Sequence, residues 1–542
     1  MTLDYDRTVV SVLDEALRQY ERSDSFTCLG HTLTYGDLDR LSGQFAAYLQ
    51  QHTDLQPGDR IAIQLPNILQ YPVALLGALR AGLVVVNTNP LYTAREVKHQ
   101  LQDSGARALV VLANIADKAA SIVADTEVEQ VIVTELADLH PPVKRVLLNT
   151  VIKYIKRMVP SFHFPRQVEF RQALGLAQGA YRKVEQSPDD VAVLQYTGGT
   201  TGVAKGAMLT HRNLVANMLQ VNKHMEGEFR VNQEYYIAPL PLYHIYAFTL
   251  HITSALSLGN HNLLIPNPRD IKGFVKTLKG KPFTCFVGLN TLFNALCRDP
   301  DFVKLDFSHL RLTASGGMAL TAAAARRWKE VTGVGIFEGY GLTETSPVVS
   351  INPPGAIQQG TVGLPMPDTE CKVIDEEGQS LPNGEPGELC VHGPQVMKGY
   401  WNRPDESRQV LDEDGWFKTG DMAVIQEDGY IRIVDRKKDM INVSGFKVFP
   451  NEVEDVLCTH PDIVEAAVVG VPDEESGELV KAYIVANRDM TVKEVREFAK
   501  KNLTPYKVPH DVEFRDELPK SNVGKVLRRE LRDEEPAKTG RA

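Results

Sequence analysis

The chain has 542 residues, more than one ordinary domain needs, and this length predicts two to four domains. Its 43% hydrophobic and 24% charged residues are typical of a globular protein with a substantial core. The formal net charge of −10 excludes a general nucleic-acid binder, because few cations remain to neutralise phosphates, although local basic groups can still hold a small polyanion.

The cysteines and the N-terminus indicate the compartment. The six cysteines are widely scattered and form no CxxC pair, which favours reduced thiols in a cytosolic protein over disulfides or a zinc site. The start, MTLDYDRTVVSVLDEAL, carries early acids and no long apolar run, so we expect no signal peptide. Residues 235–258 are the most apolar stretch, but prolines and histidines interrupt them, so we expect them in a core. These features predict a cytoplasmic protein.

Apolar strands alternate with a helical stretch near the N-terminus. RIAIQL begins at Arg60, the helical stretch QYPVALLGALRAG begins at Gln70, and the strand LVVVN follows at Leu83. Apolar runs at residues 108–114 and 130–135 continue this rhythm, which is typical of a parallel α/β sheet. The strand-to-helix pattern FTCFVGLNTLFNALC, at residues 283–297, predicts a second sheet.

Residues 144–159, KRVLLNTVIKYIKRMV, form a separate basic amphipathic pattern. One helical face would carry Leu147, Val151, Ile155 and Met158, and the polar sides would carry Lys144, Lys153, Lys156 and Arg157. Such a helix can lie on an anionic membrane surface. A surface helix that packs on its own core explains the pattern equally well.

The densest motif is YTGGTTGVAKG, residues 196–206, which follows the predicted strand VAVLQY and precedes a predicted helix capped by Thr210. Its glycines allow close backbone approach, its threonines donate hydrogen bonds, and its lysine adds positive charge, so it predicts a polyphosphate site. An ordinary flexible loop would use similar residues. It is no Walker A motif, because Gly206 follows the lysine where Ser or Thr is required. The candidate binding residues are Tyr196, Thr197, Gly198, Gly199, Thr200, Thr201, Gly202 and Lys205.

The sequence pattern changes in the last third of the chain. Between residues 361 and 434, short β-rich runs alternate with Asn-Gly, Asp-Gly and Pro-Gly turn signals, which predicts hairpins or a small barrel. After DRKKDMI comes a compact unit in which NEVEDVLCTH and VKEVREFAKKNL predict helices, and VEAAVVGVP and VKAYIVA predict strands. This unit is expected to be a separate α+β domain.

Five motifs together carry a resemblance: YTGGTTGVAKG, TASGGMAL (residues 313–320), GYGLTETSP (339–347), GWFKTGDMA (415–423) and LPKSNVGKVLRREL (518–531). Over residues 33–532 the chain resembles the adenylate-forming, AMP-binding superfamily, and most of all the bacterial long-chain fatty-acid–CoA ligases. The resemblance implies an α/β fold. A large N-terminal domain, residues 1–434, would hold two α/β-layered sheets and a β-barrel-like subdomain. A small mobile α+β domain, residues 435–542, would follow.

The resemblance also implies a nucleotide site. The glycine-rich loop would close over the β and γ phosphates of ATP, and Glu344 with Thr200 would hold Mg²⁺. Tyr340 would lie beside adenine, and Asp421 and Arg436 would contact the ribose. The remaining residues implied at the nucleotide are Gly316, Gly317, Gly339, Gly341 and Thr343. A Thr-Glu helix cap, a Thr-Gly-Asp turn and solvated surface charge are the structural alternatives for these motifs.

Catalytic roles follow from the same resemblance. Lys525 would bridge the attacking carboxylate and the α-phosphate, because two anions repel as they approach. Asp435 would be the hinge of the mobile domain, and Gly445 would belong to a loop that reaches the thiol tunnel in a second arrangement. His244, in PLPLYHIYAF, would act as a gate near the acyl carboxylate, although a lone histidine there could also be a core residue. No acid occurs between residues 239 and 265, which disfavours an amino-acid substrate.

The expected function is ATP-dependent ligation of a long-chain fatty acid to coenzyme A through an acyl-adenylate, with release of AMP and pyrophosphate. A medium-chain or aryl-CoA ligase, or a non-catalytic regulator that binds nucleotide or acyl-adenylate, are the alternatives. Fatty acid, ATP, coenzyme A and Mg²⁺ are the expected ligands, and no nucleic acid is expected. We also expect peripheral contact with the inner face of the cytoplasmic membrane, through residues 144–159, and a homodimer.

Overall fold

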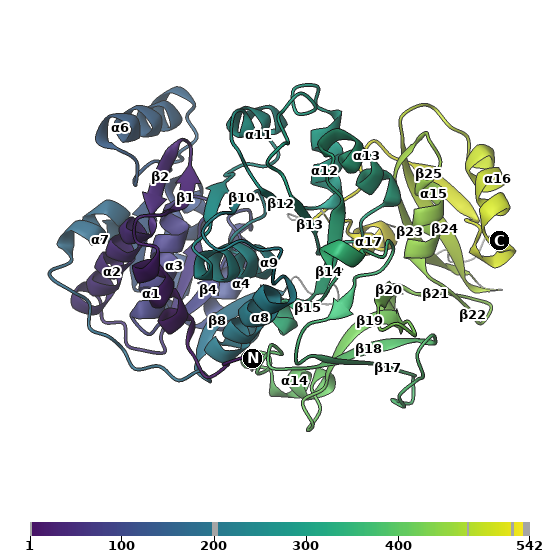
Figure 1. The fold of residues 1–542 in the computed structure, drawn as a ribbon, viewed down its shortest axis with the longest axis horizontal. Helices are drawn as coiled ribbons and strands as arrows, with labels where there is room; N and C mark the ends of the chain where they lie inside the picture. The colour runs from purple at the N-terminus through teal and green to yellow at the C-terminus, as the bar shows by residue number, and fades with distance from the viewer. Residues whose placement is uncertain (1–2, 198–203, 474–475, 522–524, 535–542) are drawn as a thin grey trace.

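A computed structural model describes residues 3–197, 204–473, 476–521 and 525–534. The chain runs from a large α/β part, through an antiparallel sheet, to a smaller α+β unit at its C-terminal end (Figure 1). This architecture confirms the predicted α/β fold with a large N-terminal part and a small C-terminal domain.

The first sheet has seven strands in the order β7–β6–β5–β3–β4–β8–β9. Neighbouring strands are parallel except β8 and β9, which are antiparallel. The strands are β3 (Arg60–Gln64), β4 (Val84–Asn87), β5 (Ala106–Leu112), β6 (Gln130–Thr134), β7 (Gln167–Glu169), β8 (Val191–Thr197) and β9 (Lys205–Thr210). The parallel strands predicted from the βαβ rhythm are confirmed.

The second sheet has nine strands in the order β16–β15–β14–β13–β12–β10–β11–β1–β2. Its central strands are parallel, and antiparallel strands close both ends. The strands are β1 (Asp24–Cys28), β2 (His31–Thr34), β10 (Tyr235–Ala238), β11 (His261–Leu264), β12 (Cys285–Gly288), β13 (Leu312–Ser315), β14 (Ile336–Gly341), β15 (Val348–Ile351) and β16 (Leu364–Pro365). The predicted second sheet is therefore confirmed.

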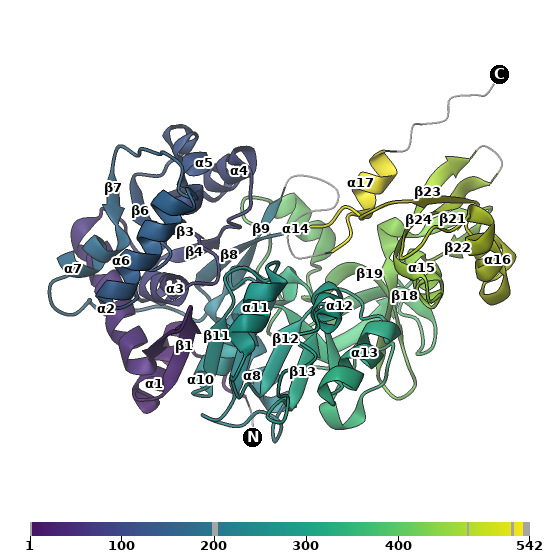
Figure 2. The same ribbon diagram turned by 90° about the horizontal axis from the view of Figure 1, so that it is seen from above.

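Helices cover both sheets and fill the space between them (Figure 2). Strand β3 illustrates the layering, because Ile61 and Ile63 join the core between the sheets while Ala62 joins the core on the outer face. The helical segments between the sheets include α1 (Val9–Gln19), α2 (Tyr35–His52), α3 (Gln70–Arg80), α7 (Phe170–Leu176), α8 (His211–His224), α9 (Ile245–Ala247), η4 (Phe248–Ser254) and α10 (Ala255–Ser257). The outer layers contain α4 (Ala94–Ser104) and α5 (Ala116–Ala120) on the first sheet, and α11 (Ile271–Leu278), α12 (Asn290–Arg298) and α13 (Ala322–Thr332) on the second.

A four-stranded antiparallel sheet follows, in the linear order β17–β18–β19–β20 expected of successive hairpins. Its core includes Val373, Leu389, Val391 and Ile431. The strands are β17 (Glu370–Ile374), β18 (Pro386–His392), β19 (Phe417–Ile425) and β20 (Ile431–Arg436), and α14 (Pro404–Val410) precedes β19.

The C-terminal unit is a five-stranded sheet in the order β22–β21–β24–β23, with β25 parallel to β24. Helices α15 and α16 bury Val453, Leu457, Val495 and Ala499 against it. Its elements are β21 (Ile441–Val443), β22 (Phe446–Val448), α15 (Pro450–Cys458), β23 (Ile463–Asp473), β24 (Gly477–Ala486), α16 (Val492–Asn502), β25 (Asp511–Phe514) and α17 (Arg528–Asp533). Helix α17 lies where this unit meets the large part (Figure 1).

The basic amphipathic segment forms α6 (Pro142–Thr150), which continues into η3 (Val151–Ile155) and projects from the large part (Figure 1). Neither stretch contains a buried residue. Val151 is half-buried, whereas Leu147, Ile155 and Met158 are 62%, 72% and 54% exposed. The apolar face is therefore largely open and does not pack on the protein's own core. Among the described helices, none is long and apolar enough to cross a bilayer.

Candidate active site

One cavity of about 2570 Å³ gathers most of the predicted site residues, at the junction of the large part, the β17–β20 sheet and the C-terminal unit. Its lining includes Tyr196, Thr197, Lys205, His244, Gly316, Gly317, Gly339, Tyr340, Gly341, Thr343, Glu344, Asp421, Arg436 and Lys525. The loop residues Gly198, Gly199, Thr200, Thr201 and Gly202 lie outside the described residues. Sequence motifs far apart in the chain thus converge on a single site.

Gly445 is the predicted residue that does not line this cavity. It lies in the turn between β21 and β22 with a φ of +86°, a conformation that favours glycine. The neighbouring Phe446 is 57% exposed and stacks on Tyr506. Gly445 therefore occupies a β-hairpin turn.

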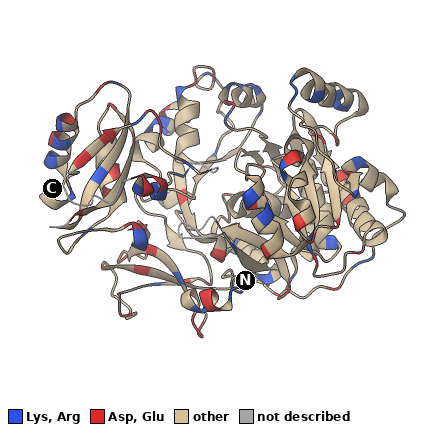
Figure 3. Ribbon diagram, turned by 180° about the vertical axis from the view of Figure 1, so that it is seen from behind, with Lys and Arg blue, Asp and Glu red and all other residues tan. Residues whose placement is uncertain are grey.

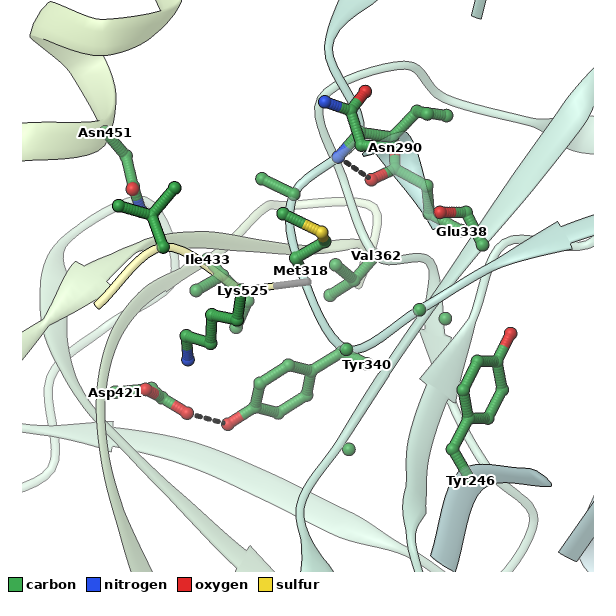
Figure 4. Close-up of a pocket in the computed structure, with 18 of the residues that line it drawn as sticks. Tyr246, Asn290, Met318, Glu338, Tyr340, Val362, Asp421, Ile433, Asn451 and Lys525 are labelled. Carbon is green, nitrogen blue, oxygen red and sulfur yellow. Dashed lines mark hydrogen bonds between the residues drawn. The ribbon is translucent and has the colours of Figure 1, made fainter. Parts of the chain in front are cut away.

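Asp421, Tyr340 and Arg436 form a connected polar group on the cavity wall. Asp421 on β19 and Arg436 on β20 are paired across the sheet, and their side chains form an ion pair of 2.6 Å. The hydroxyl of Tyr340 donates to the other carboxylate oxygen at 2.5 Å (Figure 4). Because the Asp421 side chain is 3% exposed, its position is fixed from two sides, and it presents a fixed acceptor to the cavity.

Lys525 reaches this group from the C-terminal unit. In Figure 4 its ammonium points toward Asp421 and Tyr340. The side chain lies in an open cavity, so solvent reaches it although protein groups surround it. These surroundings disfavour the charged form, and Arg436 repels it, so the pKa of Lys525 is lowered to about 8 despite the opposing attraction of Asp421.

The loop that carries Lys525 is held at its base by backbone hydrogen bonds. The amide of Ser521 donates to the carbonyl of Lys525 at 2.7 Å, and the amide of Leu527 donates to that of Pro519 at 2.8 Å. Below the loop, Leu518 and Leu531 are buried in a small core of the C-terminal unit. The position of Lys525 therefore follows the position of that unit.

Glu344 lies in η5 (Thr343–Thr345), directly after β14. The hydroxyl of Tyr400 donates to Glu344 Oε1 at 2.7 Å, and the ammonium of Lys205 lies 5.1 Å from the centre of the Tyr400 ring. Lys205 also forms an ion pair with Glu406. The end of the glycine-rich loop and the predicted metal-binding carboxylate are thus neighbours, which is the placement a polyphosphate site requires.

Gly341 marks a close backbone approach in the same motif. A Cβ atom there would lie 2.0 Å from the carbonyl oxygen of Pro347, so any side chain would displace the backbone. The chain after β14 consequently turns sharply and directs Thr343 and Glu344 to the cavity.

The donor set around Glu344 fits Mg²⁺. One carboxylate oxygen is held by Tyr400, and the other makes no hydrogen bond with the described residues. No group of three or more His, Cys, Asp or Glu side chains that could hold a metal occurs within residues 3–197, 204–473, 476–521 and 525–534. A single carboxylate suits Mg²⁺, because this ion usually takes one or two carboxylates together with phosphate oxygens.

His244 and a series of apolar residues line another part of the cavity. His244 caps α9, and its Nδ1 accepts a hydrogen bond from the amide of Tyr246 at 3.3 Å. Burial lowers the pKa of His244 to about 4, so its imidazole is neutral. The buried apolar lining residues include Val221, Met225, Leu250, Phe337, Val348 and Ile351. This uncharged lining suits a hydrocarbon chain.

Several site residues carry no recognisable signal in the sequence. Tyr400 and Glu406 contact Glu344 and Lys205 only because the β17–β20 region folds back on the large part. Glu338, two residues before Tyr340, faces the cavity (Figure 4), and its Oε2 accepts from the amide of Leu320 at 3.1 Å. Burial raises the pKa of Glu338 to about 7. Its place directly before the GYGLTETSP motif does not by itself indicate that it faces the cavity.

Comparison with known proteins agrees with this geometry. The family model described as AMP-binding enzyme matches residues 13–401, and the AMP-binding enzyme C-terminal domain matches residues 452–525. A long-chain-fatty-acid–CoA ligase of Escherichia coli O6:H1 is 51% identical over 531 residues, which cover 97% of this chain and 94% of that protein.

Solved structures of MatB from Rhodopseudomonas palustris are 29% identical to the chain in two states. The match to the ATP-bound form has a TM-score of 0.85 and covers 97% of this chain and 99% of the MatB chain. The match to the apo form has a TM-score of 0.76 and covers 97% of this chain and 98% of the MatB chain. The chain as a whole therefore superposes more closely on the ATP-bound form than on the apo form.

The chain belongs to the AMP-binding enzyme family. Over nearly its full length it is similar to bacterial long-chain fatty-acid–CoA ligases, so the resemblance predicted from the motifs is confirmed.

Proposed function

We propose that the protein joins a long-chain fatty acid to coenzyme A in two half-reactions, through an enzyme-bound acyl-adenylate. The observation that carries this proposal is the position of Lys525. Its ammonium, supplied by the C-terminal unit, lies in a cavity that also holds the Asp421–Arg436 pair and an apolar region. A binding protein needs no such cation from a second unit, whereas the adenylation of a carboxylate does.

The nucleotide would occupy the polar half of the cavity. Asp421 is a fixed acceptor for the ribose hydroxyls, and its ion pair with Arg436 holds the carboxylate in place. Lys205 and the glycine-rich loop would contact the β and γ phosphates. Lys205 would then leave its ion pair with Glu406 and bind phosphate oxygens instead. Glu344, with Thr200, would hold Mg²⁺, which supplies neutralising charge at the pyrophosphate when bound.

In the first half-reaction, a carboxylate oxygen of the fatty acid attacks the α-phosphorus of ATP. The bond from that phosphorus to the bridging oxygen breaks, and pyrophosphate leaves with the electron pair. Lys525 lies between the two anions and reduces their repulsion as they meet. The neutral imidazole of His244 borders the acyl carboxylate without adding charge.

In the second half-reaction, the thiol of coenzyme A attacks the acyl carbon and AMP leaves. This step requires Lys525 to withdraw, and we propose that residues 435–542 rotate about Asp435 and bring the Gly445 hairpin to the site. Arg298, Arg326 and Arg327, which line the cavity from α12 and α13, offer cations for the phosphates of coenzyme A.

The test separates the half-reactions. Lys525→Ala is expected to abolish fatty-acid-dependent exchange of pyrophosphate with ATP, while thioester formation from preformed acyl-adenylate continues. Equal loss of both half-reactions would contradict this role of Lys525. Lys520→Ala is the matched control, because Lys520 lies on the same loop but pairs with Glu465.

The length of the acyl chain is tested with a substrate panel. The apolar lining and the E. coli relative support a long-chain acid. We expect kcat/KM to rise from octanoate to palmitate and to be lowest for aromatic acids. A maximum at octanoate would favour the medium-chain alternative, and a maximum at coumarate the aryl alternative.

We also propose that α6 and η3 dock on an anionic membrane surface. The exposed residues Lys156 and Arg157 directly follow this segment, whose apolar face is open. Blue patches mark basic residues along the segment in Figure 3. An apolar face beside basic residues matches the boundary between acyl chains and anionic headgroups. A homodimer stays a prediction, which sedimentation velocity tests.

A further inference from the structure

Arg528, the first residue of α17, occupies the joint between the β17–β20 sheet and the C-terminal unit. Its side chain is 14% exposed, and it contacts groups from both sides of that joint. Because Arg528 follows Lys525 by only three residues, whatever fixes Arg528 also fixes the loop that carries Lys525.

On one side of the joint, Arg528 binds the predicted hinge residue. Its Nη1 lies 3.0 Å from Asp435 Oδ1, and the side chain of Asp435 is fully buried. The same carboxylate accepts from the amide of Asn451 at 2.7 Å, at the start of α15. Asp435 belongs to β20, so these bonds join the last strand of the β17–β20 sheet to two helices of the C-terminal unit.

On the other side, Arg528 binds α15. Its Nε and Nη2 lie 2.9 and 2.6 Å from the two carboxylate oxygens of Glu454, in a bidentate pair, and Nη2 also donates to the side chain of Asn451. Although burial disfavours the charged form, Glu454 and Asp435 raise the pKa of Arg528, so the guanidinium is ionised. It therefore neutralises two carboxylates that would otherwise repel each other across the joint.

We propose that Arg528 is a positioning residue for adenylation, which locks the C-terminal unit to Asp435 in the arrangement that holds Lys525 at the nucleotide site. Rotation about the backbone of Asp435 separates its carboxylate from Arg528 and Asn451, so the lock opens whenever the unit leaves for the second half-reaction. This inference rests on the proposed roles of Lys525 and Asp435.

The lock predicts an unequal effect on the two half-reactions. Without the guanidinium, Asp435 and Glu454 lose their shared cation, so fewer molecules adopt the arrangement for adenylation. In the proposed arrangement for the second half-reaction this contact is absent, so its loss has no direct effect there. Arg528→Gln is expected to lower fatty-acid-dependent exchange of pyrophosphate with ATP by at least about tenfold, since removal of one partner from a buried charge pair has large effects. Thioester formation from preformed acyl-adenylate should stay within about twofold.

Two further variants keep the result interpretable. Arg529→Gln is the matched control, because Arg529 is the next residue of α17, is 56% exposed and pairs only with Asp533 of the same helix among the described residues. Arg528→Lys keeps the charge but cannot bind Glu454 in a bidentate way, so an intermediate exchange rate is expected. Adding Asp435→Asn to Arg528→Gln should cause little further loss of exchange, since both changes remove the same contact.

The outcomes separate this inference from the proposed function. If Lys525→Ala itself leaves exchange intact, the proposed role of Lys525 fails. If Lys525→Ala abolishes exchange but Arg528→Gln behaves like Arg529→Gln, the role of Arg528 alone fails. Equal loss of both half-reactions in Arg528→Gln and Arg528→Lys would also overturn it, because that pattern indicates damage to the C-terminal unit as a whole.

Discussion

The proposed role of Lys525 requires a charged ammonium, and its surroundings oppose that charge. The protein groups that surround its ammonium lower the pKa of Lys525 to about 8, well below that of a free lysine. The negative charge of a bound polyphosphate would stabilise the ammonium of Lys525 and raise its pKa again. The free enzyme is therefore the state in which the proton is most easily lost.

This pKa predicts how adenylation depends on pH. The kcat/KM for ATP in the pyrophosphate exchange reaction should fall as pH rises through about 8, because the free enzyme loses the proton of Lys525. Lys525→Arg, whose guanidinium stays ionised throughout this range, should lack the fall even if its rate is lower. An identical fall in Lys525→Arg would assign the titration to another group.

Single residues were predictable where a dense motif carries them. Asp421, Glu344 and Lys525 line the same cavity, as their motifs predicted, although their roles stay predictions. The contacts between residues of different segments were not predictable, because Tyr400 meets Glu344 and Arg528 meets Asp435 across long stretches of chain. A glutamate, a tyrosine or an arginine outside a motif cannot be told from an ordinary surface residue in the sequence. Only the fold shows which partner it contacts.

At the scale of elements, the alternation of apolar runs with helical stretches was the reliable signal. Strand β3 and helix α3 were predicted because a short apolar run, a helical stretch and another apolar run follow one another. Helix α8 begins at the predicted cap, where the side chain of Thr210 accepts from the amide of Asn213. By contrast, β9 follows a glycine-rich loop and was not predicted, and the pairing of β1 with β11 depends on a contact between distant segments.

The projecting segment α6–η3 is the element with a function of its own to test. Neutralising Lys153, Lys156 and Arg157 to Gln should weaken co-sedimentation with phosphatidylglycerol vesicles by on the order of tenfold or more, since each basic residue near an anionic surface contributes about 1 kcal/mol. Binding should be measured at low and high salt, because the electrostatic part is screened.

The control for this experiment is an equal change of charge elsewhere. Helix α16 carries Lys493, Lys500 and Lys501 on its exposed side. Their replacement by Gln should leave vesicle binding nearly unchanged. If both triple variants lose binding equally, net charge rather than α6–η3 is responsible. Ile155→Ser should add a loss that persists at high salt, because Ile155 is apolar and 72% exposed.

At the scale of the whole molecule, the proposed chemistry requires two arrangements of the same parts. In the one seen here, Lys525 lines the cavity while the Gly445 hairpin lies away from its lining. A few contacts join the C-terminal unit to the β17–β20 sheet, among them Lys447 with Glu376 at 2.7 Å, an exposed pair of little energetic weight. The contacts at Asp435 are buried and therefore better suited than this exposed pair to hold the arrangement.

Asp435→Pro tests the hinge, and Asp435→Ala is its control. Both variants lose the carboxylate, but only proline restricts φ to about −65° and so limits backbone rotation. Adenylation should therefore decrease similarly in both, whereas overall formation of the acyl-CoA should fall further in Asp435→Pro. The measurement is the ratio of overall turnover to pyrophosphate exchange in each variant. If the ratio of overall turnover to pyrophosphate exchange is the same in Asp435→Pro and Asp435→Ala, Asp435 is not the hinge. The domain rotation between the half-reactions would then not depend on rotation at this residue.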